Sequence, residues 1–317
     1  MPRILLLCLT LLGAVSAFAQ AQPLLAPEQL KALLGNADVR IVDIREGKTP
    51  EGQPVYTAGH VPGAVSAPYS QWRGPKDNPG ALPPLDKLTA TIRSLGLAPQ
   101  VHAVIVSAGT DSTDFGAAAR VYWTLKVAGL KQLSILNGGY KAWTAASLPT
   151  RSDAVKVAAS SYTPVLDRSL IATRDEIAAL DPAKVRLLDA RPKAFFEGDT
   201  RAPAAKVPGT LVGAENFDNA RWFRPGTATF VPTDEAKRLA EQARLDGDVE
   251  TVSFCNTGHW AATNWFALSE VLGEKDVKLY PESMVDWSRS GLPMANVPNR
   301  AKQLLIDAKL WWQRTFN

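Results

Sequence analysis

The sequence of 317 residues predicts an α/β protein of two similar domains, each a small parallel β-sheet flanked by helices on both faces. Three observations support this prediction: a repeat that spans most of the chain, an alternation of helical and strand-like segments inside each copy, and a composition of 46% hydrophobic and 21% charged residues. The formal net charge of +4 is small, and no basic run with interleaved aromatic residues indicates nucleic-acid binding.

Residues 1–19 have the pattern of a secretory signal peptide that is cleaved. A basic start precedes the apolar stretch 4–15, and Ala17-Phe18-Ala19 predicts cleavage before Gln20. We therefore expect an exported, periplasmic protein with no stable membrane insertion, because no segment approaches an uninterrupted transmembrane length. A lipoprotein anchored at Cys8 is the weaker alternative, since Cys8 lies near the front of the apolar stretch rather than behind it.

Four segments of the first half recur in the second half, in the same order and at nearly constant spacing. The matching pairs, at offsets of 144 to 147 residues, are 39–45 with 185–191, 61–63 with 207–209, 104–108 with 251–255, and 138–143 with 282–287. A period of this length indicates a duplicated domain. It predicts a first domain over 20–150, a second over 151–298 and a C-terminal helical extension over 299–317, with the Ser- and Ala-rich stretch 158–161 as the linker.

The two copies predict the same elements in the same order. Each begins with a helix, followed by a short apolar strand that ends in Asp-x-Arg and by a loop rich in Gly and Pro. A second helix, a second strand, a long helix and a last short strand follow. In the first copy these four are 85–95, 101–107, 115–128 and 133–136, and in the second they are 234–244, 249–254, 261–272 and 277–280. Strands that alternate with helices indicate parallel sheets, whose functional groups lie beyond the carboxyl ends of the strands.

Cys255 lies at such a strand end, and it is the single thiol left once the signal peptide has been removed. The segment from Phe254 to Ala261 predicts a strand, a tight loop and a helix, with Gly258 permitting backbone conformations that other residues avoid. A loop that curls around the sulfur directs backbone N–H groups and a helix N-terminus toward it, which favours the thiolate. Cys255 is therefore predicted to be a nucleophile, rather than a buried small hydrophobe or a partner in an intermolecular pair.

The ordered set of Asp-x-Arg, Val-Pro-Gly, strand-loop-helix and a terminal Trp, present twice, resembles a tandem-domain rhodanese of the thiosulfate/3-mercaptopyruvate sulfurtransferase type. The resemblance covers about Leu25 to Pro293. It implies two rhodanese-like domains of which only the second is catalytic, because Ala108 matches Cys255. It also implies an active loop of six residues, which are Cys255, Asn256, Thr257, Gly258, His259 and Trp260.

The chemistry implied by the resemblance is covalent sulfur transfer with neither a cofactor nor a metal. Cys255 takes a sulfane sulfur from thiosulfate or a related small anionic donor, holds it as a persulfide, and passes it to cyanide, a thiol or a protein acceptor. Loop N–H groups from Asn256 to Trp260 are expected to stabilise the negative charge that develops in both steps.

The sequence departs from the resemblance in its cations. The active loop carries no Lys or Arg, and Phe195 stands where a further cation is expected. Three residues remain as candidates: His259, Lys193 and Arg191. His259 either supplies a proton-dependent charge or is an exposed loop residue. Arg191 either reaches the site or forms a bracing ion pair with Asp189.

Other uses of a cysteine at this position fit less well. A Cys-based phosphatase needs Arg at the sixth position after the cysteine, where this chain has Ala261. A disulfide oxidoreductase needs a second cysteine, and one cysteine with three scattered histidines makes no recognisable zinc site. The main alternative is a non-enzymatic periplasmic sulfur-carrier or binding protein that serves a specific partner.

Two aromatic features have two interpretations each. Trp260 either closes the pocket over the persulfide or packs at the domain interface. In the C-terminal extension, Leu304, Ala308, Trp311, Trp312 and Phe316 share one helical face. This face either docks a partner or packs on its own domain, and packing is the expected outcome.

Overall fold

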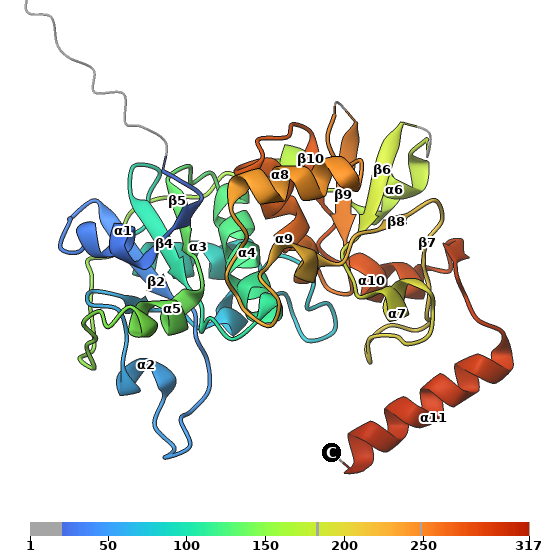
Figure 1. Ribbon diagram of the computed structural model, residues 1–317, viewed down its shortest axis with the longest axis horizontal. Helices are drawn as coiled ribbons and strands as arrows, with labels where there is room; N and C mark the ends of the chain where they lie inside the picture. The colour runs from blue at the N-terminus through green and yellow to red at the C-terminus, as the bar shows by residue number, and fades with distance from the viewer. Residues whose placement is uncertain (1–20, 182–183, 248, 317) are drawn as a thin grey trace, which may run out of the picture.

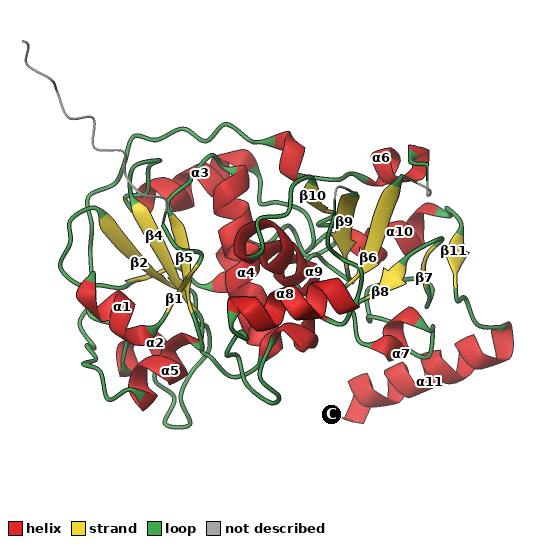
Figure 2. Ribbon diagram, turned by 45° about the horizontal axis from the view of Figure 1, so that its top comes forward, coloured by secondary structure: helices red, strands yellow, loops and turns green. Residues whose placement is uncertain are grey.

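The computed structural model describes residues 21–181, 184–247 and 249–316, so the predicted signal peptide and Cys8 lie outside the described residues. Two parallel sheets lie toward opposite ends of an elongated body, with helices packed between and around them (Figures 1 and 2). The predicted α/β architecture is confirmed. None of the helices in the described part is long and apolar enough to cross a bilayer.

The first copy is built on a five-stranded parallel sheet in the order β1-β5-β4-β2-β3. Its strands are β1 (Leu24–Leu25), β2 (Val39–Asp43), β3 (Val65–Ser66), β4 (His102–Val106) and β5 (Leu133–Leu136). Its helices are α1 (Pro27–Ala32), α2 (Val55–Ala58), the 3-10 helix η1 (Tyr69–Trp72), α3 (Leu85–Ser94), α4 (Ser112–Val127) and α5 (Gly139–Ala145). The central strands are rich in β-branched residues and buried, as strands covered on both faces should be.

The second copy repeats this plan with a four-stranded parallel sheet in the order β10-β9-β6-β8. Its strands are β6 (Val185–Asp189), β8 (Glu215–Asn216), β9 (Glu250–Phe254) and β10 (Val277–Leu279), and β7 (Thr210–Leu211) pairs antiparallel with β11 (Met294–Ala295). Its helices are η2 (Arg168–Leu170), α6 (Arg174–Ala179), α7 (Lys193–Phe196), η3 (Asn219–Trp222), α8 (Thr233–Gln242), α9 (Trp260–Trp265), the π-helix η4 (Phe266–Val271) and α10 (Ser283–Ser290). Thr173 and Glu176 form a capping box that fixes the start of α6.

The long helix predicted over 261–272 is an α-helix only in its first part. From Phe266 it continues as η4, where the N–H of Leu272 donates to the carbonyl of Ala267 five residues earlier. Three consecutive side chains at the start of η4, Phe266 to Leu268, are buried. The apolar run is therefore continuous in sequence although the helical geometry changes within it.

Helix α4 of the first copy packs against α9 and η4 of the second, between the two sheets (Figure 2). Phe115 meets Phe266 edge to face, with ring centroids 5.7 Å apart. The Tyr122 hydroxyl donates to a Glu270 carboxylate oxygen over 2.8 Å, and Lys126 forms an ion pair with the same carboxylate at 2.6 Å. One core cluster contains buried residues of both copies, so the copies share a hydrophobic interior.

The C-terminal helix α11 (Arg300–Phe316) projects from the body, and the packing predicted for its apolar face is wrong (Figure 1). That face is exposed at Leu304, Ala308, Trp311 and Trp312, and the Phe316 side chain lies outside what the structure describes. The helix packs instead through Ile306 on its opposite side. Ion pairs of Asp307 with Arg201 and of Lys302 with Asp199 hold that side.

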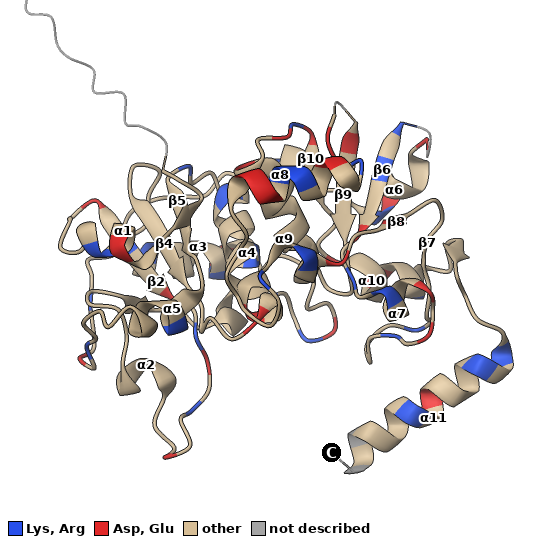
Figure 3. Cartoon of the chain, in the orientation of Figure 1, with Lys and Arg blue, Asp and Glu red and all other residues tan. Residues whose placement is uncertain are grey.

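In Figure 3, α11 and the outer helix α8 carry charged residues, whereas α9 carries none.

Candidate functional site

Cys255 follows the last residue of β9 and is 1% exposed. The loop that begins with it is fastened to the start of α10 by two main-chain hydrogen bonds. The N–H of Met284 donates to the carbonyl of Cys255, and the N–H of Val285 donates to the carbonyl of Asn256. The sulfur therefore lies at the carboxyl end of a central strand, where the sequence predicted it.

Ser283 organises the loop, and the sequence interpretation missed it. Its Oγ accepts the N–H of Cys255 at 3.0 Å and the N–H of Gly258 at 3.2 Å, while its hydroxyl donates to the carbonyl of Tyr280 at 2.7 Å. The Gly258 N–H was expected to face a developing negative charge, and it is bound to Ser283 instead. Among the described residues, the N–H groups of Asn256, Thr257 and His259 have no hydrogen-bond partner.

Gly258 is required at its position for two reasons. Its φ of +66° lies in the left-handed region, and a Cβ atom there would meet a guanidinium nitrogen of Arg120 and the carbonyl of Pro281, each at 2.4 Å. Any larger residue would push the loop away from the first copy, so the tight loop and the domain interface depend on the same glycine.

Asp189 and Arg191 form a buried ion pair with several hydrogen bonds. The Arg191 Nη2 lies 2.6 Å from an Asp189 carboxylate oxygen and also donates to the carbonyl of Gly209. A longer contact of 3.4 Å joins the guanidinium to the side-chain oxygen of Asn256. This geometry matches the alternative in which Arg191 forms a bracing ion pair with Asp189. The contact with Asn256 also connects this ion pair to the loop. Lys193 forms an ion pair with Glu197 on the surface, and this ion pair does not place Lys193 near Cys255.

His259 is fixed between the two copies rather than projecting into solvent. Its Nε2 lies 2.6 Å from the carbonyl of Thr113 and its Nδ1 lies 2.8 Å from the hydroxyl of Tyr69. A carbonyl only accepts, so Nε2 carries the proton and Nδ1 accepts from Tyr69. Burial and the nearby Arg73 lower the pKa of His259 to about 4. His259 is therefore neutral near pH 7, and the proton-dependent charge expected of it is absent there.

Two cations near the loop come from the copy that lacks a cysteine. Arg73 donates to the carbonyl of Thr257 at 2.9 Å and to the Tyr69 hydroxyl at 3.0 Å. Arg120 donates to the carbonyl of Gly258 at 3.3 Å. No sequence signal identified them, because they lie 182 and 135 residues before Cys255 in segments that the repeat does not match.

Trp260 lies at the domain boundary. Its indole N–H donates to the Thr113 hydroxyl at 3.1 Å, and its ring meets Phe195 edge to face with centroids 5.8 Å apart. These contacts fit the interface alternative for Trp260. Phe195, at the position where a cation was expected, packs on this indole.

The first copy holds a different site at the position of Ala108. The N–H groups of Ala108 and Gly109 donate to the Asp114 carboxylate at 3.2 and 2.5 Å. A cavity of about 330 Å³ opens here, lined by Arg45, Tyr140 and Asp114 among others. An anion entering it would meet the Asp114 carboxylate, which already accepts the loop N–H groups, so this geometry disfavours anion chemistry in the first copy.

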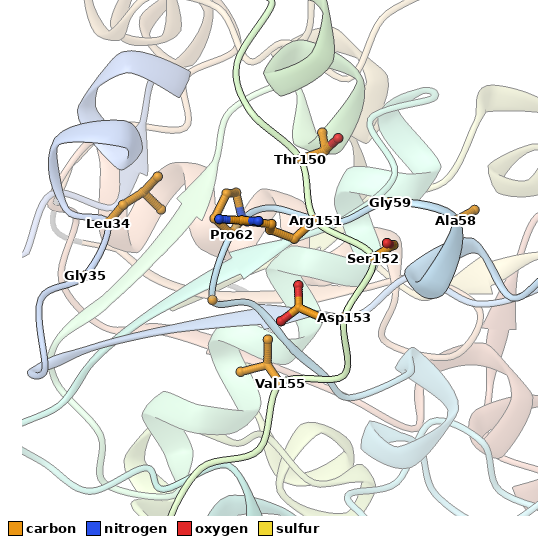
Figure 4. Close-up of a pocket in the computed structure, with 11 residues that line it drawn as sticks. Leu34, Gly35, Ala58, Gly59, Pro62, Thr150, Arg151, Ser152, Asp153 and Val155 are labelled. Atoms are coloured by element: carbon orange, nitrogen blue, oxygen red, sulfur yellow. The ribbon is translucent and has the colours of Figure 1, made fainter.

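A larger cavity, of about 950 Å³, lies between the first copy and the stretch 151–155 that follows it (Figure 4). Arg151 and Asp153 contribute its charged side chains, and its other lining residues carry no thiol or imidazole. Cys255 does not line this cavity, so the cavity and the candidate nucleophile lie in different parts of the protein. No cluster of three or more potential metal ligands occurs within the described ranges.

Comparison with known proteins identifies related sequences over most of the chain. Residues 26–146 and 173–290 each match the rhodanese-like domain family. A Mycolicibacterium smegmatis protein named "Putative thiosulfate sulfurtransferase" is 31% identical over 256 residues, which cover 77% of this chain and 88% of that protein. A protein of the same name from Synechococcus elongatus is 26% identical over 299 residues, covering 90% of this chain and 89% of that one.

Solved structures share the architecture. SseA from Escherichia coli, described with the rhodanese fold of 3-mercaptopyruvate sulfotransferases, matches with a TM-score of 0.70 at 23% identity, covering 83% of this chain and 99% of SseA. The anaerobic ergothioneine biosynthesis enzyme from Chlorobium limicola matches with a TM-score of 0.72 at 18% identity, covering 86% of this chain and 69% of that enzyme. At these identities the likeness concerns the fold.

Proposed function

This chain belongs to the rhodanese family, and from that premise we propose that it moves a sulfane sulfur from thiosulfate or a related anionic donor to cyanide or a thiol through a persulfide on Cys255. The observation that carries the proposal is the position of Cys255. It is the one cysteine among the described residues, and it lies at the carboxyl end of β9 inside a loop with unoccupied N–H groups.

The proposed reaction has two balanced steps. The Cys255 thiolate attacks the outer sulfur of thiosulfate, the S–S bond of the donor breaks, and sulfite leaves with its electron pair. Cyanide then attacks the terminal sulfur of the persulfide, the Cys255 thiolate leaves, and thiocyanate is released. The N–H groups of Asn256, Thr257 and His259 stabilise the negative sulfur in both steps, and Arg191 holds Asn256 in place.

The first copy is proposed to be catalytically inactive and the second catalytic. Ala108 has no nucleophilic atom, and Asp114 already accepts the N–H groups of its loop. The first copy nevertheless contributes Tyr69, Arg73 and Thr113 to the surroundings of the active loop. Its proposed role is to complete the site of the second copy.

The experiment that tests the proposed function is sulfur loading. The protein is exposed separately to thiosulfate and to 3-mercaptopyruvate, and intact mass is measured for the gain of one sulfur atom, with Cys255→Ser as the control. We expect loading by at least one donor, no loading of the variant, and loss of the added sulfur on addition of cyanide. Failure of both donors to load Cys255 would overturn the proposal, and turnover without loading would overturn the persulfide route.

The second candidate function is a sulfur carrier that serves a protein partner, and the observation that favours it is that the loop from Cys255 to Trp260 carries no Lys or Arg. A carrier would load from a donor and retain its sulfur against cyanide. Rapid formation of thiocyanate from the loaded protein would contradict the carrier function.

Export to the periplasm is part of the proposal and rests on residues 1–19. The mature protein is expected to begin at Gln20 after expression with its own leader. Mass analysis of the N-terminus after fractionation of the cell tests this, and an intact Met1 in a cytoplasmic fraction would argue against it.

A further inference from the structure

Arg120 is a buried cation without an anionic partner. It lies in the middle of α4, is 0% exposed, and donates to three carbonyls, those of Gly80, Ala81 and Gly258. Its Nε has no hydrogen-bond partner. None of the ion pairs in the described part of the chain includes it. Arg73 beside it likewise has only neutral partners, the Tyr69 hydroxyl and the carbonyl of Thr257.

A buried guanidinium without a counterion is costly, because the desolvation of its charge is offset only by hydrogen bonds to neutral groups and, for Arg120, by the Trp123 ring, whose centroid lies 4.8 Å from the guanidinium carbon. Burial and the neighbouring Arg73 lower the pKa of Arg120 to about 9, while Tyr69, Glu282 and Cys255 act in the opposite direction. Arg120 therefore keeps its charge near pH 7. His259 adds no positive charge there, and Glu282 lies outside ion-pair distance of Arg120.

The hydrogen bonds of the two arginines also orient the active loop. In a trans peptide the C=O and N–H groups point in opposite directions. Arg73 binds the carbonyl of Thr257, and the N–H of the same peptide unit, that of Gly258, turns inward to Ser283. Arg120 binds the carbonyl of Gly258, so the N–H of His259 points away from Arg120 and into the loop. A cation on each carbonyl polarises the inward N–H groups.

We infer that Arg73 and Arg120 of the first copy supply the positive potential that the Cys255 loop lacks, so that a negatively charged sulfur on Cys255 is balanced from across the domain boundary. The two arginines are positioning residues, since they act through the loop peptides and through their field. Their role in sulfur transfer rests on the proposed function. The electrostatic potential that they create at the Cys255 sulfur does not depend on that function and is measured separately.

Paired alkylating reagents measure the electrostatic potential at a thiolate. Iodoacetate and iodoacetamide react with the same thiolate and have similar sizes, but only iodoacetate is charged, so the ratio of their rate constants cancels effects on thiolate fraction and on access. The rate constants are measured at Cys255 by mass analysis of the peptide that contains it. We expect Arg120→Gln and Arg73→Gln each to lower the iodoacetate-to-iodoacetamide ratio by roughly fivefold, the size expected for loss of one nearby unit charge at an intermediate effective dielectric constant.

Two further variants separate charge from structure. Arg120→Lys keeps the charge and is expected to restore most of the ratio. Arg186→Gln is the matched control, because Arg186 also donates to main-chain carbonyls, those of Arg244 and Leu245. Arg186 is the second residue of β6 and lies at the end of the sheet opposite Cys255. Its ratio is expected to equal that of the wild type. Should burial prevent Arg120→Gln from folding, the half-buried Arg73 carries the same test.

An unchanged ratio in Arg73→Gln and Arg120→Gln would overturn the inference, as would an equal fall in Arg186→Gln. This result is distinguishable from failure of the proposed function. If the ratio falls but neither donor loads Cys255, the charge balance holds and the sulfur transfer does not. If loading occurs and the ratio is constant, the sulfurtransferase holds and its cations lie elsewhere.

Discussion

Ser283 has a left-handed backbone conformation, and the matching residue of the first copy, which has the same conformation, is a glycine. The φ angle is +54° at Ser283 and +59° at Gly139, and the repeat places the two residues at matching positions. A side chain at such an angle is unfavourable unless it makes compensating contacts. Here the hydroxyl binds two N–H groups of the active loop. A serine in place of the repeat's glycine was thus the sequence signal for this residue.

Two substitutions at Ser283 should separate stability from function. Ser283→Ala loses the hydrogen bonds and keeps the strain, so the free energy of unfolding is expected to fall by about 1–3 kcal/mol. Ser283→Gly loses the same bonds but relieves about 1 kcal/mol of strain, so it is expected to be the more stable variant. Both should load sulfur more slowly than the wild type. Denaturant titration and intact mass measure the two effects, and wild-type loading by Ser283→Gly would contradict the role of the hydroxyl.

The lowered pKa of His259 leads us to expect a loss of folding stability in acid. Its pKa is about 4 in the folded protein against an ordinary value of 6.5, so the unfolded chain binds the proton more readily. The contribution is fully present above pH 6.5 and is lost as the pH falls toward 4, with a total of at most about 3 kcal/mol. The free energy of unfolding should therefore fall more between pH 7 and pH 4 in the wild type than in His259→Gln. An equal loss in both proteins would show that other groups cause it.

Helix α4 presents one face to the active loop. Thr113, Gly116 and Arg120 are three and four residues apart and therefore lie on the same side of the helix. Thr113 accepts from His259, and Arg120 holds the carbonyl of Gly258. A Cβ atom at Gly116 would lie 3.0 Å from two imidazole atoms of His259. The glycine permits the close approach of the helix to the ring.

Gly116→Val tests this face at the level of the element. The added methyl groups should displace the His259 imidazole, weaken its bonds to Tyr69 and Thr113, and slow sulfur loading by about tenfold or more, a loss of about 1.4 kcal/mol or more in transition-state stabilisation. Helical content, followed by circular dichroism, should not fall, because valine tolerates a helix better than glycine does. Ala118→Gly on the same helix is the control for altered helix stability. Unchanged loading in Gly116→Val would show that the ring does not depend on this contact.

The two copies form one structural unit. They share a hydrophobic cluster, and the loop of Cys255 is bound by Tyr69, Arg73, Thr113 and Arg120 of the first copy. Phe266 and Trp265 of the second copy are buried against α4. Separation would expose this apolar surface and release the loop.

The second domain expressed alone, as residues 151–298, is therefore expected to lack sulfur loading and to self-associate. Loading is measured by intact mass and association by analytical ultracentrifugation, with residues 20–298 as the control. The first domain added in trans should restore part of the loading if the interface re-forms. A monomeric second domain that loads at the wild-type rate would contradict the dependence on the first copy.

The amino-acid sequence determined the duplicated α/β fold and the place of Cys255 at a strand end, and it gave the pairing of Asp189 with Arg191 as one of two alternatives. Hydrophobic periodicity, the repeat and local motifs are properties of neighbouring residues and can be recognised without coordinates. The exposed face of α11 and the π-turn at Phe266 were not predictable in this way, because they depend on which surfaces meet. Tertiary structure alone decided where the cations of the site are. Arg73 and Arg120 lie far from Cys255 in the chain and belong to the other copy, and only the packing of α4 on the active loop brings them to it.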